Sequence, residues 1–177
     1  MRKIFLLLLI GCFFQSARAQ SFADEIDAFK LEDSIRFPAK GQILFIGSSS
    51  FRLLRDTTPL FPGYSILNRA FGGATLADVI HWRYETIFPY EPRQIVLYCG
   101  ENDLAAADTV SAAEVANRLK QLFRLIRARY PTVSFVFVSM KPSPSRIHLL
   151  EKIAAANKMI QLFLQSQQSA RFVDVFT

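Results

Sequence analysis

The stretch that decides the fold reads Gln42-Ile43-Leu44-Phe45-Ile46-Gly47-Ser48-Ser49-Ser50. A short, unbroken apolar run that ends at a glycine is typical of a strand buried on both faces. Such strands occur in parallel sheets, where helices cover the sheet. The stretch therefore predicts a parallel sheet with a serine-rich turn at the carboxyl end of one strand.

The same alternation continues along the rest of the chain. Four more apolar segments have the character of strands, at residues 64–68, 93–99, 133–138 and 171–176. Segments with helical periodicity precede or separate them, at residues 21–36, 75–87, 111–130 and 143–167. Hydrophobic residues make up 51% of the chain and charged residues 20%, which excludes a disordered chain. The pattern predicts an α/β fold in which a five-stranded parallel sheet lies between helices.

Two of the predicted helices have recognisable start signals. Ser111 and Glu114 have the spacing of a capping box, in which each side chain binds the backbone N–H of the other residue. The apolar stripe behind them consists of Val115, Leu119, Leu122, Phe123 and Ile126. Ser143-Pro144 predicts a second start, with serine as the cap and proline in the first helical position. The apolar stripe of that helix consists of Leu149, Ile153, Ile160 and Leu164.

The beginning of the chain has the pattern of a secretory signal peptide. Arg2 and Lys3 precede an apolar run over residues 4–14, and Ala17-Arg18-Ala19 resembles the small-residue site of signal cleavage. The apolar run is too short to span a bilayer comfortably. These features predict a signal peptide over residues 1–19.

Cleavage is expected before Gln20, which leaves one domain over residues 20–177. The mature protein is then exported, either to the periplasm or out of the cell, without stable insertion into the membrane. Two alternatives are an anchor that is retained and a lipoprotein that is modified at Cys12.

Removal of the leader takes away much of the positive charge. The full chain has 21 Lys and Arg and 15 Asp and Glu, and loss of Arg2, Lys3 and Arg18 leaves 18 basic residues. No block of five like charges occurs, so no nucleic-acid or anionic-membrane partner is expected. Cys99 is then the only cysteine and is expected to be a buried apolar residue. With two histidines and no cysteine pairs, neither a metal site nor a cofactor is predicted.

Three polar loops follow consecutive predicted strands. They are the serine loop, Gly47-Ser48-Ser49-Ser50; the glycine loop, Asn68-Arg69-Ala70-Phe71-Gly72-Gly73-Ala74-Thr75; and the asparagine loop, Gly100-Glu101-Asn102-Asp103. Ligands of parallel α/β sheets bind beyond the carboxyl ends of the strands, so these loops are expected to form one site. A serine hydroxyl can act as a nucleophile, while glycine N–H groups and a side-chain amide can stabilise an oxyanion. Taken singly, each loop also has an ordinary interpretation as a turn or a helix cap.

Together the three loops resemble the sequence blocks of the SGNH (GDSL-type) hydrolase family. The resemblance covers most of residues 41–177, in the order of the family's blocks. It implies that Ser49 is the nucleophile, with Ser48 in the place where the family usually has aspartate. It also implies that the oxyanion hole is formed by Gly73 and Asn102, together with the N–H of Ser49. The family's fold is a flavodoxin-like three-layer α/β/α sandwich, in agreement with the pattern of strands and helices.

The resemblance stops before the family's last block. That block is an Asp-x-x-His after the fifth strand, which supplies the catalytic base, and residues 171–177 contain no histidine. A serine hydroxyl needs such a base because the neutral alcohol is a poor nucleophile. We expect the chain to be a fragment of a longer enzyme; the alternatives are a natural truncation of low activity and a protein that binds acylated ligands without turning them over. His81 and His148 are weak candidates for a substitute base, and Asp174 is expected to be structural.

The resemblance implies an exported serine esterase or acylhydrolase. Its expected substrate is a small ester or an acylated carbohydrate, with O-acetyl groups as one candidate. The first alternative is a catalytically inactive relative that binds a ligand or carbohydrate. The second is a flavodoxin-like protein whose serine loop holds phosphate or FMN, although no glycine-rich nucleotide motif is present. The sequence indicates no particular oligomeric state.

Overall fold

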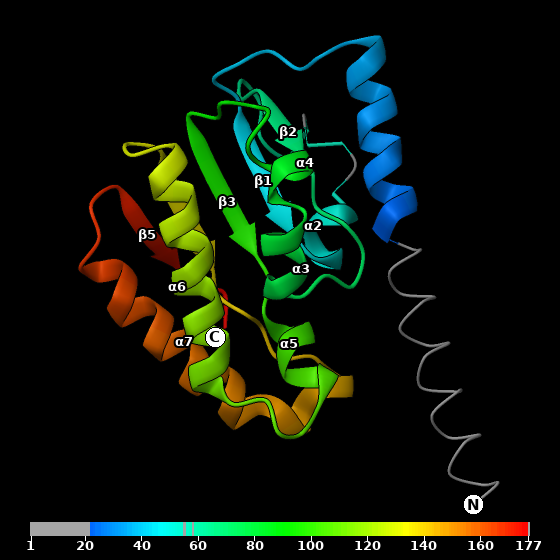
Figure 1. Cartoon of the computed structure of the whole chain (residues 1–177). Helices are drawn as coiled ribbons and strands as arrows, with labels where there is room; N and C mark the ends of the chain where they lie inside the picture. Colours follow the sequence, from blue (N-terminus) through cyan, green and yellow to red (C-terminus); the bar gives the residue numbers. More distant parts are fainter. Residues whose placement is uncertain (1–21, 55, 58, 177) are drawn as a thin grey trace, which may run out of the picture. The chain divides into compact units, whose positions relative to one another are not determined.

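The computed structural model describes residues 22–54, 56, 57 and 59–176 (Figure 1). The chain divides into two compact units, Met1–Phe37 and Pro38–Thr177. In the first unit, residues 22–35 form a helix, which confirms the helix predicted there. The signal peptide predicted over residues 1–19 lies outside the described residues. Among the described residues, no helix combines the length and the apolar character needed to cross a membrane.

The second unit contains a five-stranded sheet in which every neighbouring pair of strands is parallel. The strands lie in the order β2-β1-β3-β4-β5. Their bounds are Ile43–Gly47 for β1, Ile66–Asn68 for β2, Gln94–Tyr98 for β3, Ser134–Val138 for β4 and Ala170–Val173 for β5. All five predicted strands are therefore confirmed, and β5 ends three residues earlier than expected.

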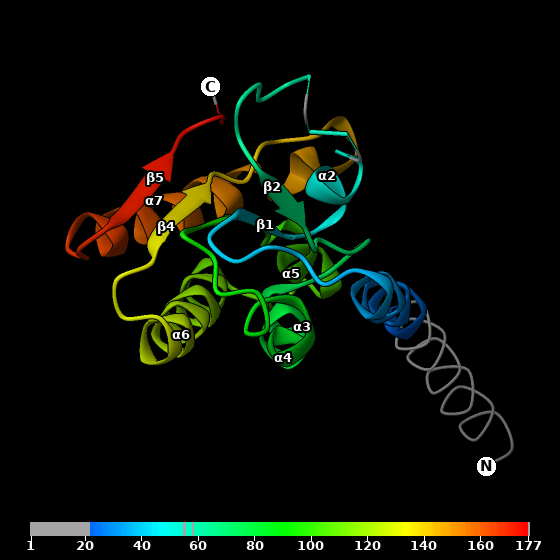
Figure 2. The same ribbon diagram turned by 90° about the horizontal axis from the view of Figure 1, so that it is seen from above.

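The predicted helices of this unit follow the strands in the expected alternation. One further helix, α5, was not predicted and begins inside the asparagine loop, at Glu101. They are α2 (Ser49–Arg52), α3 (Leu76–His81), α4 (Arg83–Thr86), α5 (Glu101–Ala106), α6 (Ala112–Arg129) and α7 (Leu150–Gln165), with a 3₁₀ segment, η1 (Pro144–Leu149), before α7. The connection from β1 to β2 leads toward one side of the sheet, whereas the later connections lead toward the other side. Because such crossovers are right-handed, α2 lies on one face, and α3, α4, α6 and α7 lie on the other. Figure 2 shows α2 on the opposite side of the sheet from α3, α4 and α6.

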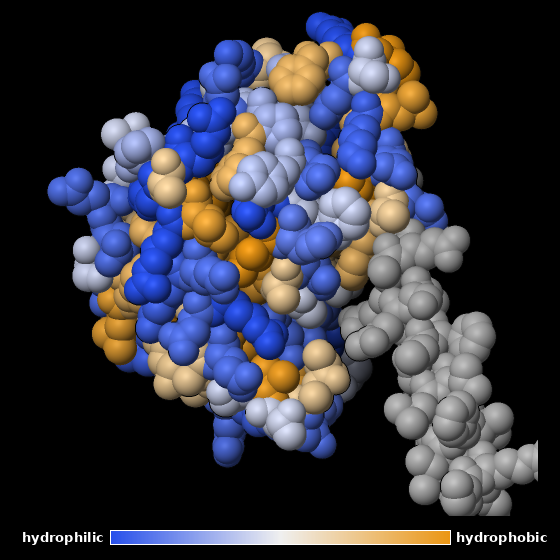
Figure 3. All heavy atoms as spheres, viewed as in Figure 1, coloured by the Kyte–Doolittle hydropathy of each residue, from blue (hydrophilic) through white to orange (hydrophobic). Residues whose placement is uncertain are grey.

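The main core lies between the sheet and the layer that contains α6. Its strand residues are almost completely buried: Leu44, Ile46, Ile95, Leu97, Phe135 and Phe137. Phe123 of α6 packs edge-on against Phe135, with ring centroids 5.2 Å apart. The predicted stripes of α6 and α7 are buried. The outer surface of this layer is largely hydrophilic, with hydrophobic residues exposed between the helices (Figure 3).

The opposite face of the sheet is lined by the alternate side chains of the same strands. A cavity of about 550 Å³ lies over it. Its lining is mainly apolar: Ile43, Phe45, Phe51, Leu54, Phe61, Tyr64, Ile66, Gln94, Val96, Val136, Val138, Val173 and Val175. The two helical layers therefore cover the sheet unequally, because α2 has only four residues and α6 has 18.

Two predicted helices differ from the structure in detail. The Ser111 hydroxyl accepts a hydrogen bond from the N–H of Glu114, as its capping box requires, whereas the Ser143 side chain makes no cap bond. The segment after Ser143 begins as a 3₁₀ turn, with a non-helical backbone at Arg146 (φ −123°, ψ 21°). The helix predicted over residues 75–87 is interrupted at Trp82, which separates α3 from α4.

Candidate active site

The three polar loops meet at the carboxyl edge of β2, β1 and β3. The N–H of Ser48 donates to the carbonyl of Tyr98 at 2.9 Å, which joins the serine loop to the end of β3. The N–H of Phe71 donates to the carbonyl of Gly47 at 3.1 Å, which joins the glycine loop to the end of β1. The expectation that these loops lie at one edge of the sheet is therefore fulfilled by the topology and by direct hydrogen bonds.

The serine loop is a tight turn from β1 into α2. Gly47 has a φ of +123°, and an added Cβ at this position would overlap the carbonyl oxygen of Tyr98. Only glycine lets the chain turn this close to β3. Beyond the turn, Ser48 is buried and Ser49, the first residue of α2, is exposed. Of these two hydroxyl-bearing residues, Ser49 is therefore the one presented to solvent.

Asn68, the first residue of the glycine loop, fixes the loop by hydrogen bonds of its side chain. The side-chain amide of Asn68 donates to the carbonyls of Phe51 and Leu54 and accepts from the N–H of Ala70. This arrangement ties the loop to α2. Further along, Gly73 has a φ of +75°, and an added Cβ there would meet no atom within 4 Å. Gly73 thus has the left-handed backbone that favours glycine, next to open space.

The asparagine loop contributes the side-chain amide of Asn102, whose oxygen and one of whose N–H groups already form hydrogen bonds within the protein. Asn102 Nδ2 donates to the carbonyl oxygen of Ala74 at 2.9 Å, which joins the asparagine loop to the glycine loop. Asn102 Oδ1 accepts a hydrogen bond from the guanidinium of Arg146 at 2.7 Å. An amide nitrogen has two N–H groups, so one remains for a ligand. Asn102 therefore has one N–H available to donate, and its place in an oxyanion hole stays a prediction.

Asp103 joins the glycine loop to the helical layer from a completely buried position. Its carboxylate accepts from the N–H of Leu76 at 2.8 Å and from the guanidinium of Arg118 at 2.7 Å. Burial raises the pKa of this carboxyl, while the hydrogen bonds from Arg118 and Leu76 lower it. Asp103 thus connects α5, the start of α3 and α6 beneath the candidate site.

Replacing Asp103 with alanine is expected to lower the free energy of unfolding by about 3 kcal/mol, because Leu76 N–H and Arg118 lose a buried partner. Urea unfolding measures the change. The matched control is Asp108→Ala, at an exposed position of the same loop region, which is expected to change the stability by less than about 0.5 kcal/mol. Equal effects of the two substitutions would contradict the structural role of Asp103.

A second buried carboxylate lies at the same edge. The hydroxyl of Tyr98 donates to the carboxylate of Glu101, and both residues are buried. Burial raises the pKa of both the Tyr98 hydroxyl and the Glu101 carboxyl. The positive charges of Arg146 and Lys141 lower the pKa of Glu101, but less than burial raises it. The pair therefore places a carboxylate directly before Asn102.

Cys99 is fully buried, and its thiol donates to the carbonyl of Ala74. Burial raises its pKa well above the ordinary value. The prediction of a buried cysteine is confirmed.

The structure does not join either histidine to the three loops. His81 is exposed in the last position of α3, which runs away from the carboxyl edge, and its ring lies edge-on to Trp82. Asp78-Val79-Ile80-His81 has the spacing Asp-x-x-His, but Asp78 is engaged in the capping box of α3 with Thr75. His148 is exposed in η1.

Asp174 accepts a hydrogen bond from the hydroxyl of Ser139, in keeping with the structural role expected for it. Within the part of the chain that the structure describes, no three His, Cys, Asp or Glu side chains form a group that could hold a metal ion.

The contacts that sequence reasoning missed join residues far apart in the chain. Arg118 lies 15 residues from Asp103, and Arg146 lies 44 residues from Asn102. Neither arginine belongs to a motif. One feature of the sequence indicated that charged partners were needed there. Glu101 and Asp103 flank Asn102 directly after an apolar strand, where carboxylates are expected to require partners.

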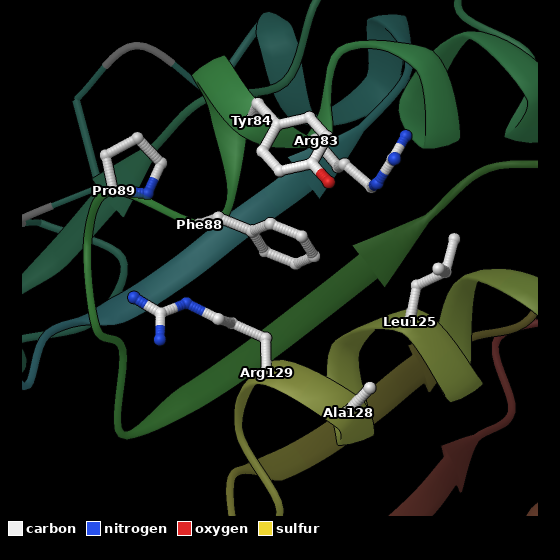
Figure 4. A pocket seen from close by; sticks show the side chains of 7 residues that line it. All are labelled: Arg83, Tyr84, Phe88, Pro89, Leu125, Ala128 and Arg129. Atoms are coloured by element: carbon white, nitrogen blue, oxygen red, sulfur yellow. The ribbon is translucent and has the colours of Figure 1, made fainter.

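Another hollow, of about 580 Å³, lies between α4 and α6. It is lined by Arg83, Tyr84, Phe88, Pro89, Leu125, Ala128 and Arg129 (Figure 4). The guanidinium groups of Arg83 and Arg129 lie on opposite sides of Phe88. Because α4 and the last turn of α6 lead into the starts of β3 and β4, this hollow is at the amino edge of the sheet, away from the three loops.

Solved structures of similar fold include a GDSL-like lipase and an acetylxylan esterase. A proposed platelet activating factor from Streptococcus pneumonia is 20% identical, with a TM-score of 0.79 over 96% of this chain and 81% of its own. A GDSL-like lipase from Bacteroides thetaiotaomicron is 18% identical, with a TM-score of 0.71 over 84% of this chain and 77% of its own. A catalytic mutant of an acetylxylan esterase from Geobacillus stearothermophilus is 14% identical, with a TM-score of 0.63 over 78% of each chain.

These similarities confirm the predicted resemblance to SGNH hydrolases at the level of the fold, together with the flavodoxin-like arrangement of the sheet. No protein-family model matches the chain, and no curated protein matches it either.

Proposed function

We propose that this protein is an exported serine esterase of the SGNH type. The observation that carries the proposal is the arrangement at one sheet edge, where an exposed serine at a tight turn adjoins a hydrogen-bonded pair of loops. Ser49 supplies the hydroxyl, Gly73 a left-handed backbone next to open space, and Asn102 an amide with one N–H to spare. This combination suits acyl transfer, which needs a nucleophile and donors for an oxyanion.

In the proposed reaction the Ser49 hydroxyl oxygen attacks the carbonyl carbon of an ester. The negative charge that forms on the carbonyl oxygen is stabilised by the N–H groups of Ser49 and Gly73 and by the Asn102 amide. Loss of the alcohol leaves an acyl group on Ser49, and water then releases the acid. The proton of the hydroxyl goes to a base and from the base to the leaving oxygen, which departs as the alcohol. The family supplies that base from the Asp-x-x-His block after the fifth strand.

The proposed substrate is a small acyl ester, with O-acetyl groups on carbohydrate as the favoured class. One structural neighbour is an acetylxylan esterase, and export would bring the enzyme to such polymers. The mature domain proposed over residues 20–177 carries the three loops.

A serine-directed fluorophosphonate tests the proposal on the protein expressed from its natural gene. One equivalent is expected to react, and trypsin is expected to release the label on the peptide of residues 41–52, which holds all three serines of the loop. Fragmentation of that peptide is expected to place the added mass on Ser49. Hydrolysis of p-nitrophenyl acetate and of acetylated xylo-oligosaccharides is measured in parallel.

Label on a serine outside residues 48–50, or ester hydrolysis that survives complete labelling of Ser49, would contradict the proposed nucleophile. Binding of acetylated carbohydrate without labelling or turnover would favour the inactive relative instead.

A further inference from the structure

Arg146 contacts the proposed oxyanion-hole amide from a distant part of the chain. Its guanidinium donates to Asn102 Oδ1 at 2.7 Å, and the side chain is half-buried. A hydrogen bond from a charged donor is shorter and stronger than one between neutral groups. Arg146 is therefore a specific partner of Asn102.

The contact decides which atom of the amide faces a ligand. Asn102 Oδ1 is occupied by Arg146, and one Nδ2 hydrogen is occupied by the carbonyl of Ala74. If the amide turned over, its oxygen would face the Ala74 carbonyl and its nitrogen would face the guanidinium, and both bonds would be lost. In the orientation that remains, the second Nδ2 hydrogen is bound by neither Ala74 nor Arg146. Withdrawal of charge by the guanidinium also makes that N–H a stronger donor.

The surroundings of Arg146 hold the guanidinium in place. The backbone leaves the helical conformation at Arg146 within η1, and its N–H bonds the carbonyl of Ser143 at 2.9 Å. Glu101 immediately precedes Asn102, and the positive charge of Arg146 lowers the pKa of the Glu101 carboxyl. The Tyr98 hydroxyl donates to the same carboxyl. An ionised Glu101 attracts the guanidinium of Arg146, although burial raises the pKa of that carboxyl and so opposes its ionisation.

We propose that Arg146 is a positioning residue for the oxyanion hole: it orients and polarises the amide of Asn102 without touching the ester itself. This inference rests on the proposed esterase function. Because Arg146 acts through Asn102, the loss caused by its removal is no larger than the loss caused by removal of Asn102.

A double-mutant cycle tests the proposal by steady-state kinetics on p-nitrophenyl acetate. Arg146→Ala is expected to lower kcat about tenfold and to change KM less than twofold, because the amide acts on the transition state. In the Asn102→Ala background the same substitution is expected to change kcat less than twofold. Equal losses in the two backgrounds, or a loss confined to KM, would overturn the proposal.

Chemical rescue separates positioning from a structural role. Guanidinium ion added to Arg146→Ala is expected to restore part of kcat, because it can occupy the space of the deleted group. The control is Arg124→Ala, at an exposed position of α6, which is expected to keep the parent kcat with or without guanidinium. Absence of rescue in a folded Arg146→Ala protein would count against the proposal.

NMR of the Asn102 side chain tests the positioning role without any ester hydrolysis, so failure of this inference can be told apart from failure of the proposed function. In ¹⁵N-labelled protein, the side-chain NH₂ signals of Asn102 are assigned by their loss in Asn102→Asp. Arg146→Ala is expected to shift these signals and to speed their exchange with solvent, while Arg124→Ala leaves them in place. Unchanged Asn102 signals in Arg146→Ala would overturn the positioning role, even in a protein that hydrolyses no ester.

Discussion

Replacing Ser49 with alanine is expected to lower the kcat for p-nitrophenyl acetate by about 10⁴-fold or more. The substitution removes the atom that forms the acyl intermediate, and no neighbouring group supplies an equivalent hydroxyl at the first position of α2. The residue is exposed, so the fold is expected to keep its stability. The measurement is initial-rate hydrolysis by the protein expressed from its natural gene.

The two neighbouring serines provide matched controls. Ser48 is 1% exposed and cannot present its hydroxyl to an ester, and Ser50 is less exposed than Ser49 and lowers the pKa of Tyr98, against the effect of burial. Ser48→Ala and Ser50→Ala are therefore expected to keep kcat within about tenfold of the parent. If Ser50→Ala abolished turnover and Ser49→Ala did not, the nucleophile would be Ser50 and the alignment with the family's first block would be shifted by one residue.

Replacing Asn102 with alanine is expected to lower kcat by about 10²–10³, with little change in KM, as for other oxyanion-hole donors. The free Nδ2 hydrogen is the group lost, and it interacts more strongly with the oxyanion than with the ground-state carbonyl. Asn102→Asp is expected to give a similar loss. The aspartate keeps the size of the side chain and an acceptor for Arg146, but it has no N–H.

Asn117→Ala, at an exposed position of α6, is the control and is expected to leave kcat unchanged. Full activity of Asn102→Asp would remove Asn102 from the oxyanion hole. Thermal unfolding of each variant accompanies the kinetics, because Asn102 also joins the asparagine loop to the glycine loop through Ala74.

The local parts of this molecule follow from the amino-acid sequence by itself. The apolar run before Gly47 forms β1, and the capping box of Ser111 and Glu114 begins α6, as predicted. These features depend on residues a few positions apart, so backbone preferences and hydrophobic periodicity are enough to predict them. The common edge of the three loops could also be predicted, because parallel strands bring their carboxyl ends together.

What only the tertiary structure decided is how polar groups far apart in the chain meet. Periodicity predicts that Leu149 and Ile153 are buried, but it says nothing of Arg146, whose guanidinium reaches Asn102 and whose backbone departs from the helix predicted there. The completely buried carboxylate of Asp103 likewise could not be matched with Arg118 in advance. The physical reason is that a charged side chain inside a protein is stable only with a partner, and that partner is chosen by the folded backbone rather than by spacing along the chain.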